Sequence, residues 1–258
     1  MIQRVFNCVA SPPDSRNLLF HERLASAPPV VLPPSVDLRP LCSPIVDQGE
    51  LGSCTANAWV SGLREFLLLK EGKPLDRLSR LFLYYQERLD EGAVQEDAGA
   101  NLKDGGDCLI NHGVCKEALD PYDISTFKNP PSAAAMAEAP DFKVRKYMQL
   151  TSLGAVKACL AQGYPVVMGM NVYDHMQSEQ AAKLGSVACP RQGEQALGGH
   201  AVTIVGYKDT PKGPGYWKDG GYLIVRNSWG TSWGLQGYFK IAYAYVTLGY
   251  AFEFWTCR

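Results

Sequence analysis

The hydrophobic pattern of the chain changes near its middle, and this change restricts the possible folds more than any other feature of the sequence. In the first half, apolar residues recur at intervals of three and four, which is typical of a helix with one buried face. The clearest series starts at Cys54 and comprises Ala56, Trp59, Leu63, Phe66 and Leu67. Gly72 and Pro74 then predict the end of this helix.

The remaining elements separate into a helical half and a β-rich half. Ser79 can cap a second helix that runs through Leu89, and a third helix is predicted over residues 102–112. An alanine-rich segment near 132–139 and a helix over 153–162 follow. Strands are then predicted from β-branched and aromatic residues between glycine-containing turns, over residues 165–170, 201–207, 222–225, 238–242 and 250–255. The sequence therefore predicts an α+β fold.

The length of the chain favours one domain with two lobes. At 258 residues it is near the size at which a single core divides into two packed halves. We expect a helical lobe at about residues 34–140 and a β lobe at about 141–258. The stretch up to Pro34 contains three Pro-Pro pairs and little periodicity, which predicts that residues 1–33 form an extended arm on a surface or in a groove.

Charge and hydropathy exclude several classes of partner. The chain has 25 Lys and Arg against 26 Asp and Glu, a formal net charge of -1, without a long run of one sign. Neither nucleic acid nor a membrane surface is therefore expected as a partner. The longest apolar runs are far shorter than the roughly 20 residues that cross a bilayer. Arg4 and Asn7 interrupt what would be the apolar stretch of a secretory signal, which favours the cytoplasm.

One cysteine lies where a thiol becomes reactive. The segment Gln48-Gly-Glu-Leu-Gly-Ser-Cys54 is a glycine-rich turn that delivers Cys54 to the start of a predicted helix. Backbone N-H groups and the helix dipole stabilise negative charge at such a position. A cysteine at a helix start is more often only a small buried residue, so the assignment of Cys54 as a nucleophile depends on the wider context.

That context is a resemblance to the papain family of cysteine peptidases. The segment before Cys54 resembles the family's nucleophile motif, and His200 follows at the spacing of about 130 to 150 residues that this signature carries. Residues 198–207 resemble the family's histidine strand, and residues 225–234, with Asn227-Ser-Trp-Gly, resemble its asparagine segment. Residues 34–39 resemble the start of the mature enzyme, so the likeness covers most of the chain.

The resemblance implies a role for each matching residue. Cys54 would attack the scissile carbonyl, and His200 would hold the thiol proton and pass it to the leaving amine. Asn227 would orient the imidazole, and Trp229 would cover that contact from water. Gln48 would donate a hydrogen bond to the developing oxyanion, together with the backbone N-H of Cys54.

The resemblance also implies where substrate binds. The cleft between the lobes would hold an extended peptide, with the pocket for the second acyl-side residue near Gly199 and Ala201, the strand of Met168 and Met170, and Glu253 near the C-terminus. A carboxylate there would accept arginine as well as apolar side chains. Alternatively, Glu253 is an exposed strand carboxylate without a role in binding.

Two residues depart from the family pattern. Leu51 stands where the family usually has a disulfide-forming cysteine, and Thr55 stands where an aromatic residue usually follows the nucleophile. Neither change removes a catalytic group. The first leaves the disulfide pairing of the eight cysteines unassigned.

Weaker motifs point to metal sites without completing one. Cys108, His112 and Cys115 have zinc-like spacing, but no fourth ligand is evident and helix packing explains them better. His21-Glu22 begins like a zinc protease motif, but Ala25 replaces the second histidine. No cofactor is therefore expected.

The sequence thus predicts a papain-like cysteine peptidase that forms a thioester acyl-enzyme, with endopeptidase action favoured. Residues 1–33 are interpreted as a short pro-region or a cover of the cleft. Two alternatives remain: a peptidase-like peptide-binding protein without activity, and an acyltransferase that uses a Cys-His pair. Transglutaminase-like acyltransferases generally use aspartate where Asn227 stands, so they resemble the chain less.

Overall fold

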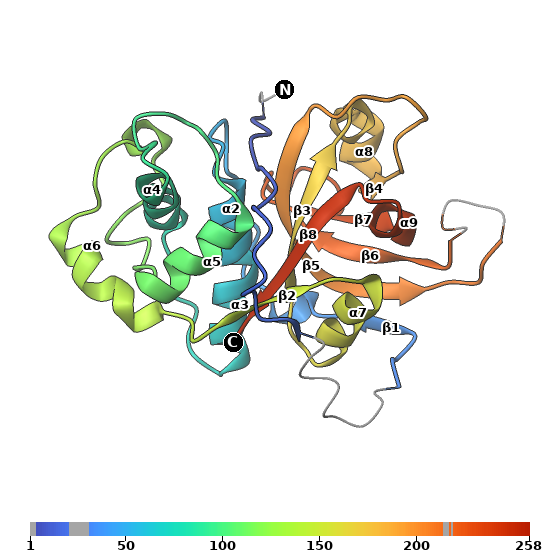
Figure 1. Cartoon of the computed structure of the whole chain (residues 1–258), viewed down its shortest axis with the longest axis horizontal. Helices are drawn as coiled ribbons and strands as arrows, with labels where there is room; N and C mark the ends of the chain where they lie inside the picture. The colour runs from blue at the N-terminus through green and yellow to red at the C-terminus, as the bar shows by residue number, and fades with distance from the viewer. Residues whose placement is uncertain (1–3, 21–30, 214–216, 218) are drawn as a thin grey trace.

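The computed structural model describes residues 4–20, 31–213, 217 and 219–258. Helices form one side of the molecule and strands the other (Figure 1), as the change in hydrophobic pattern predicted. The N-terminal residues 4–20, here called the strap, run between these two lobes. No helix in the described part of the chain has the length and apolar character to span a membrane.

The helical lobe is built around one continuous helix that starts at Cys54. It comprises α2 (Cys54–Ala56), a π-helical stretch (Asn57–Arg64) and α3 (Glu65–Lys70). Its predicted end is confirmed, since Gly72 has a φ of +74°, a conformation that glycine adopts without steric cost. α4 (Arg80–Asp90) and α5 (Leu102–Asn111) pack against it, and α6 (Ala133–Glu138) lies on the outside of the lobe, where its Met136 contacts Gln86 of α4.

Side-chain caps define where these surrounding helices begin. The predicted cap is confirmed at Ser79, whose hydroxyl accepts a hydrogen bond from the backbone N-H of Phe82. Asn101 caps α5 in the same way, and Ser132 caps α6. The first turns of α4, α5 and α6 are therefore each stabilised by a side-chain cap.

The β lobe is a mostly antiparallel sheet. Within the described residues it has eight strands in the order β2-β8-β3-β5-β6-β7-β4, with β1 paired to β5. The strands are β1 (Ser35–Asp37), β2 (Tyr147–Leu150), β3 (Val166–Val172), β4 (Ser186–Val187), β5 (Gly198–Asp209), β6 (Gly221–Arg226), β7 (Tyr238–Ala242) and β8 (Ala251–Cys257). Three helices flank it: α7 (Leu153–Ala161), α8 (Glu179–Leu184) and α9 (Tyr243–Thr247).

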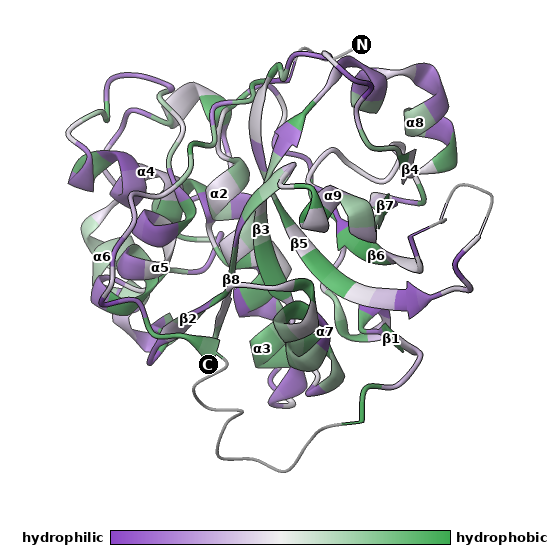
Figure 2. Ribbon diagram, turned by 45° about the vertical axis from the view of Figure 1, so that its right-hand side comes forward, coloured by the Kyte–Doolittle hydropathy of each residue, from purple (hydrophilic) through white to green (hydrophobic). Residues whose placement is uncertain are grey.

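The central helix packs directly on strand β5. Thr203 donates a hydrogen bond to the carbonyl of Ala58 across the lobe boundary, with an O to O distance of 3.0 Å. The approach is so close that a Cβ on Gly62 would lie 1.9 Å from the Thr203 hydroxyl. The ribbons of β3 and β5 are strongly hydrophobic where they cross the molecule (Figure 2). This contact fixes the helix start relative to the histidine strand.

Several short elements were not predicted. β1 lies in the residues expected for the helical lobe, yet it pairs with β5, so the chain enters the β lobe before it crosses to Cys54. β2, α8 and α9 also escaped prediction, because segments of four to six residues carry too little periodicity to identify. The turn expected within residues 213–221 joins β5 to β6, but residues 214–216 and 218 lie outside the described part.

Candidate active site

Cys54 occupies the first position of the central helix and is completely buried. The preceding turn requires Gly49, whose φ is +63°. Both carboxylate oxygens of Asp97 accept from the N-H of Gly52 at 3.0 Å, which anchors the turn to the helical lobe. The sulfur of Cys54 thus sits at the positive end of the helix dipole.

The surroundings of Cys54 favour its ionised form. A hydrogen bond from the thiol of Cys8 lowers the pKa of Cys54 well below its ordinary value, and the imidazole of His200 lowers it further, although burial opposes both effects. The same hydrogen bond, together with burial, raises the pKa of Cys8. Cys54 is therefore the more acidic thiol of the pair.

His200 on β5 is oriented by Asn227. The Nε2 atom of His200 lies 2.9 Å from Oδ1 of Asn227. That same oxygen accepts the backbone N-H of Ser228 at 2.9 Å, which fixes the amide with its oxygen toward the imidazole. Nε2 must then be the donor, because an amide oxygen only accepts. Nδ1 is buried without another hydrogen-bond partner and remains for the proton of Cys54.

Aromatic rings cover the His200–Asn227 contact on two sides. Trp229 stacks on the imidazole with a centroid distance of 4.9 Å and an interplanar angle of 27°. Phe6 of the strap approaches the imidazole edge-on at 6.2 Å and Trp229 at 6.0 Å. Water is kept from the hydrogen bond that holds the imidazole.

Gln48 lies beside the turn with its amide held at both ends. Its Oε1 accepts from the hydroxyl of Ser228 at 2.6 Å, and its Nε2 donates to the carbonyl of Leu51 at 3.0 Å. One of the two Nε2 hydrogens is thereby engaged, and the second is left for an oxyanion. Ser228, which orients both Gln48 and Asn227, was missed as a site residue, although the Asn-Ser-Trp-Gly pattern contained it.

The two departures from the family pattern are accommodated in the helical lobe. Leu51 is buried in the same apolar cluster as Cys54. The hydroxyl of Thr55 donates to Oε2 of Glu87 at 2.7 Å. Burial raises the pKa of Glu87 well above its ordinary value, which favours the uncharged form of this carboxyl group behind Cys54.

Three predicted substrate-binding residues lie near Cys54 or the strap. Ala201 shares an apolar cluster with Cys54 and Cys8. Gly199 pairs with the strap. Glu253 on β8 is buried, not exposed, and accepts hydrogen bonds from the indole N-H of Trp255 at 2.9 Å and from a strap backbone N-H at 3.3 Å. These residues therefore lie along one path across the sheet.

The expectation for Met168 and Met170 is corrected by the structure. Both side chains belong to the hydrophobic core inside the β lobe, whereas Val167, which directly precedes Met168, belongs to the cluster of Cys54 and Ala201. Side chains on a strand alternate between its two faces, so a single strand segment cannot direct all of them to the cleft. Gly169, paired with both Ala201 and Glu253, stands on the cleft side.

The strap crosses the whole site. The backbone N-H of Cys8 donates to the carbonyl of Gly199 at 3.2 Å. Arg4 donates to the carboxylate of Asp47 at 2.5 Å and to the carbonyl of Gly49 at 2.9 Å. A Cβ on Gly199 would lie 2.0 Å from the carbonyl oxygen of Cys8, so only glycine leaves room for the strap there. No sequence signal predicted that Arg4, Phe6 or Cys8 would reach the site.

The weaker metal motifs form no site in the described part of the chain. Cys108 donates to a carboxylate oxygen of Asp90 at 3.4 Å, and Cys115 is buried in the helical lobe. No group of three or more potential ligands gathers within the residues that the structure describes. His21, Glu22 and Ala25 lie outside the described residues.

Comparison with known proteins gives consistent matches. The family model described as papain family cysteine protease matches residues 32–251. An uncharacterized peptidase C1-like protein of Acanthamoeba polyphaga mimivirus is 34% identical over 98% of this chain and 86% of its own length. Cysteine proteinase 3 of Entamoeba histolytica is 31% identical over 81% of this chain, which spans 63% of that protein.

A solved structure agrees over almost the full chain. Xylellain, a cysteine protease from Xylella fastidiosa, is similar with a TM-score of 0.84 and 32% sequence identity. The match covers 98% of this chain and 95% of xylellain. Both lobes therefore have counterparts in one solved protein.

Proposed function

Because the chain belongs to the papain family of cysteine proteases, we propose that it is an active endopeptidase whose strap holds it closed until substrate or processing displaces it. The observation that carries this proposal is the arrangement at Cys54. Apart from the Cys8 thiol of the strap, the imidazole of His200 also lowers the pKa of Cys54, and Asn227 fixes that histidine through Nε2. The proposed catalytic residues are Cys54, His200, Asn227 and Gln48.

The reaction begins when the strap leaves the cleft. The thiolate of Cys54 attacks the peptide carbonyl, and the resulting oxyanion is stabilised by the backbone N-H of Cys54 and the second N-H of Gln48. His200 then gives its Nδ1 proton to the leaving amine, and a thioester remains on Cys54. Water, activated by the neutral imidazole, hydrolyses the thioester and restores the thiolate.

The direction in which the strap runs predicts that it is a poor substrate. If Glu253 lines the pocket of the second acyl-side residue, a substrate runs from Glu253 toward Cys54 in the N-to-C direction. The strap runs the opposite way, since Cys8 lies at Cys54 and Ser11, further along the chain, donates to Glu253. Its carbonyl groups are therefore not presented for attack as those of a substrate would be.

The strap also occupies a hydrogen-bond acceptor in the proposed pocket for arginine. Its Ser11 N-H occupies Oε1 of Glu253, while Trp255 occupies Oε2. When the strap is displaced, Oε1 loses its partner and can accept a charge-assisted hydrogen bond from a substrate guanidinium. This supports a preference for arginine, alongside apolar residues, at the second acyl-side position.

A labelling experiment tests the proposal. Substoichiometric iodoacetamide at mildly acidic pH, followed by peptide mapping, should modify Cys54 slowly in the full chain and much faster in a chain that begins at Pro34. Equal labelling rates would show that the strap does not close the cleft. If Cys54 reacts no faster than the buried thiol of Cys108 in either protein, Cys54 is not an activated nucleophile.

Two other functions predict different products. An acyltransferase would move the acyl group to an added amine such as glycine amide, whereas a peptidase releases mainly the free acid. An inactive peptide-binding protein would release neither product and would still bind the peptide. Mass analysis of products from one peptide, with and without the amine, separates the three.

A further inference from the structure

The strap places a second cysteine directly on the nucleophile, and nothing in peptide hydrolysis requires it. Cys8 is buried in the same apolar cluster as Cys54, with 4% of its surface exposed. Its thiol lies within hydrogen-bonding reach of the Cys54 sulfur. Two cysteines in contact are the geometric precondition for a disulfide.

The backbone on both sides of Cys8 holds it in this position. On the N-terminal side, Phe6 packs against His200, and a Cβ on Gly198 would lie 2.1 Å from the Phe6 carbonyl oxygen. Asn7 forms a bridge to Gly199 and donates from its side chain to the carbonyl of Asp97 at 2.9 Å. Cys8 therefore has little freedom to turn away from the nucleophile.

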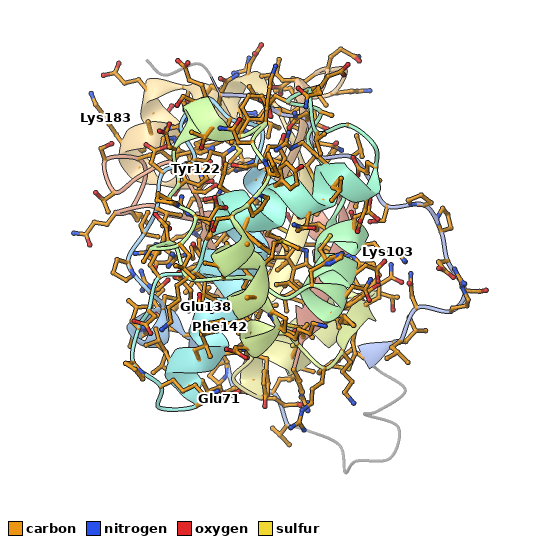
Figure 3. All side chains as sticks on the ribbon, turned by 90° about the vertical axis from the view of Figure 1, so that its left-hand side faces the viewer. Glu71, Lys103, Tyr122, Glu138, Phe142 and Lys183 are labelled. Carbon is orange, nitrogen blue, oxygen red and sulfur yellow. The ribbon has the colours of Figure 1, made fainter. Side chains whose placement is uncertain are left out.

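The C-terminal part of the strap is anchored on the helical lobe as well. Val9 forms a bridge to Asn101, and the hydroxyl of Ser11 accepts the backbone N-H of Lys103 at 3.1 Å. Figure 3 shows Lys103 on this side of the molecule, next to the strap. The strap is thus fixed on both sides of Cys8.

We propose that Cys8 is a resolving cysteine, which forms a reversible Cys8–Cys54 disulfide after a hydroperoxide oxidises the nucleophile. This inference rests on the proposed function in one respect, because it needs Cys54 to be a reactive thiolate. The disulfide would occupy the nucleophile and tie the strap across the cleft. It would also protect Cys54 from irreversible oxidation.

The chemistry has two steps. The thiolate of Cys54 attacks hydrogen peroxide while the strap is lifted, the O-O bond breaks, and Cys54 sulfenic acid forms with release of hydroxide. When the strap closes, the sulfur of Cys8 attacks the sulfenic sulfur. The S-S bond forms, and the sulfenic hydroxyl leaves as water with the thiol proton of Cys8. Two thiols of dithiothreitol return two electrons and two protons and restore both cysteines.

The asymmetry of the pair suits this order of events. Cys54 keeps the adjacent imidazole of His200 when the Cys8 thiol has moved away, and this imidazole also lowers its pKa, so Cys54 is the sulfur that reacts with peroxide. Cys8 has a raised pKa and stays a thiol until the sulfenic acid is presented to it. A resolving cysteine next to a low-pKa cysteine is the arrangement that redox-sensitive sites require.

The test compares the full chain with Cys8→Ser and with Cys42→Ser, which removes a partly exposed cysteine whose thiol faces the Leu38 carbonyl. Each protein is treated with hydrogen peroxide, quenched, and mapped by mass spectrometry without reduction. The full chain and Cys42→Ser should lose two hydrogen atoms and yield one cross-linked peptide pair that contains Cys8 and Cys54. Cys8→Ser should instead gain oxygen at Cys54 as sulfinic acid.

Recovery of the free thiol gives a second readout. Dithiothreitol should restore iodoacetamide-reactive Cys54 in the full chain, and roughly tenfold less of it in Cys8→Ser, because sulfinic acid resists thiol reduction. Sulfinic acid at Cys54 without the cross-link in the full chain, or a cross-link from Cys54 to another cysteine, would overturn the inference. Both readouts are independent of peptide cleavage, so a chain without peptidase activity that still forms the cross-link would contradict only the proposed function.

Discussion

At the scale of single residues, the sequence predicted which residues of the two lobes come together, but not the contacts of the strap with them. Gln48, Cys54, His200 and Asn227 were found by motif and spacing, and the structure gathers them at one point. Cys8 could not be found in this way, because its contact with Cys54 depends on how an irregular segment crosses the cleft. Met168 and Met170 were misplaced because spacing alone does not say which face of a strand a side chain occupies.

Gln48 provides a test of the oxyanion site. Gln48→Ala should lower kcat for peptide hydrolysis by about 10² to 10³, because one preorganised donor is lost. KM should change little, since this hydrogen bond forms in the transition state and not in the bound substrate. Gln195→Ala, which changes an exposed glutamine, serves as the control. A variant with unchanged kcat would exclude Gln48 from the reaction.

Glu253 provides a test of the substrate pocket. In a chain that begins at Pro34, Glu253→Ala should lower kcat/KM about 10- to 100-fold for substrates with arginine at the second acyl-side position, because a charge-assisted hydrogen bond is lost. Substrates with leucine there should be much less affected. The exposed carboxylate of Glu179 is changed as a control. Equal losses for both substrates would mean that Glu253 has only a structural role.

At the scale of elements, long helices and strands were predicted and short ones were not. The helices that start at Cys54, Ser79 and Leu102 have apolar periodicity together with a cap or a glycine stop, so local signals agree. β1, by contrast, spans three residues and exists because it pairs with β5, which is far away in the sequence. Its lobe could not be deduced from its own composition.

The contact between the central helix and β5 depends on Gly62. Gly62→Ala should destabilise the fold by about 1 to 3 kcal/mol, because a Cβ at this position meets the Thr203 hydroxyl at 1.9 Å and the lobes must separate. Gly154→Ala is the matched control, since a Cβ there comes only within 3.8 Å of Ser152 and alanine favours the helix. Urea unfolding measures the free energy of unfolding of both variants, and equal values would refute the close-packing argument.

Glu87 on α4 predicts a pH dependence of stability. Its pKa is raised in the folded state by burial, so its contribution is fully present below the unfolded value of about 4.3 and is lost as the pH rises toward the folded value. Glu87→Gln should therefore gain on the order of 1 kcal/mol or more at pH 8 relative to the native chain, and little at pH 4. Thermal unfolding at both pH values measures this. A gain of the same size at both would show that Glu87 is not protonated in the fold.

At the scale of the whole molecule, the two lobes bring the proposed catalytic residues together at their boundary. The helical lobe supplies Cys54 and Gln48, and the β lobe supplies His200 and Asn227. The strap contacts both lobes, through Asn101 on one side and Gly199 on the other. The arm was predicted from its prolines to lie on a surface or in a groove, and its path over the nucleophile emerges only in three dimensions (Figure 1).

The central claim is that Cys54 performs peptide hydrolysis once the strap is removed. The most direct measurement is the cleavage of a fluorogenic dipeptide by a chain that begins at Pro34, compared with the same chain carrying Cys54→Ala, after circular dichroism has shown that both are folded. We expect hydrolysis by the first and none by the second. Absence of cleavage by both folded proteins, or equal cleavage by both, would contradict the claim.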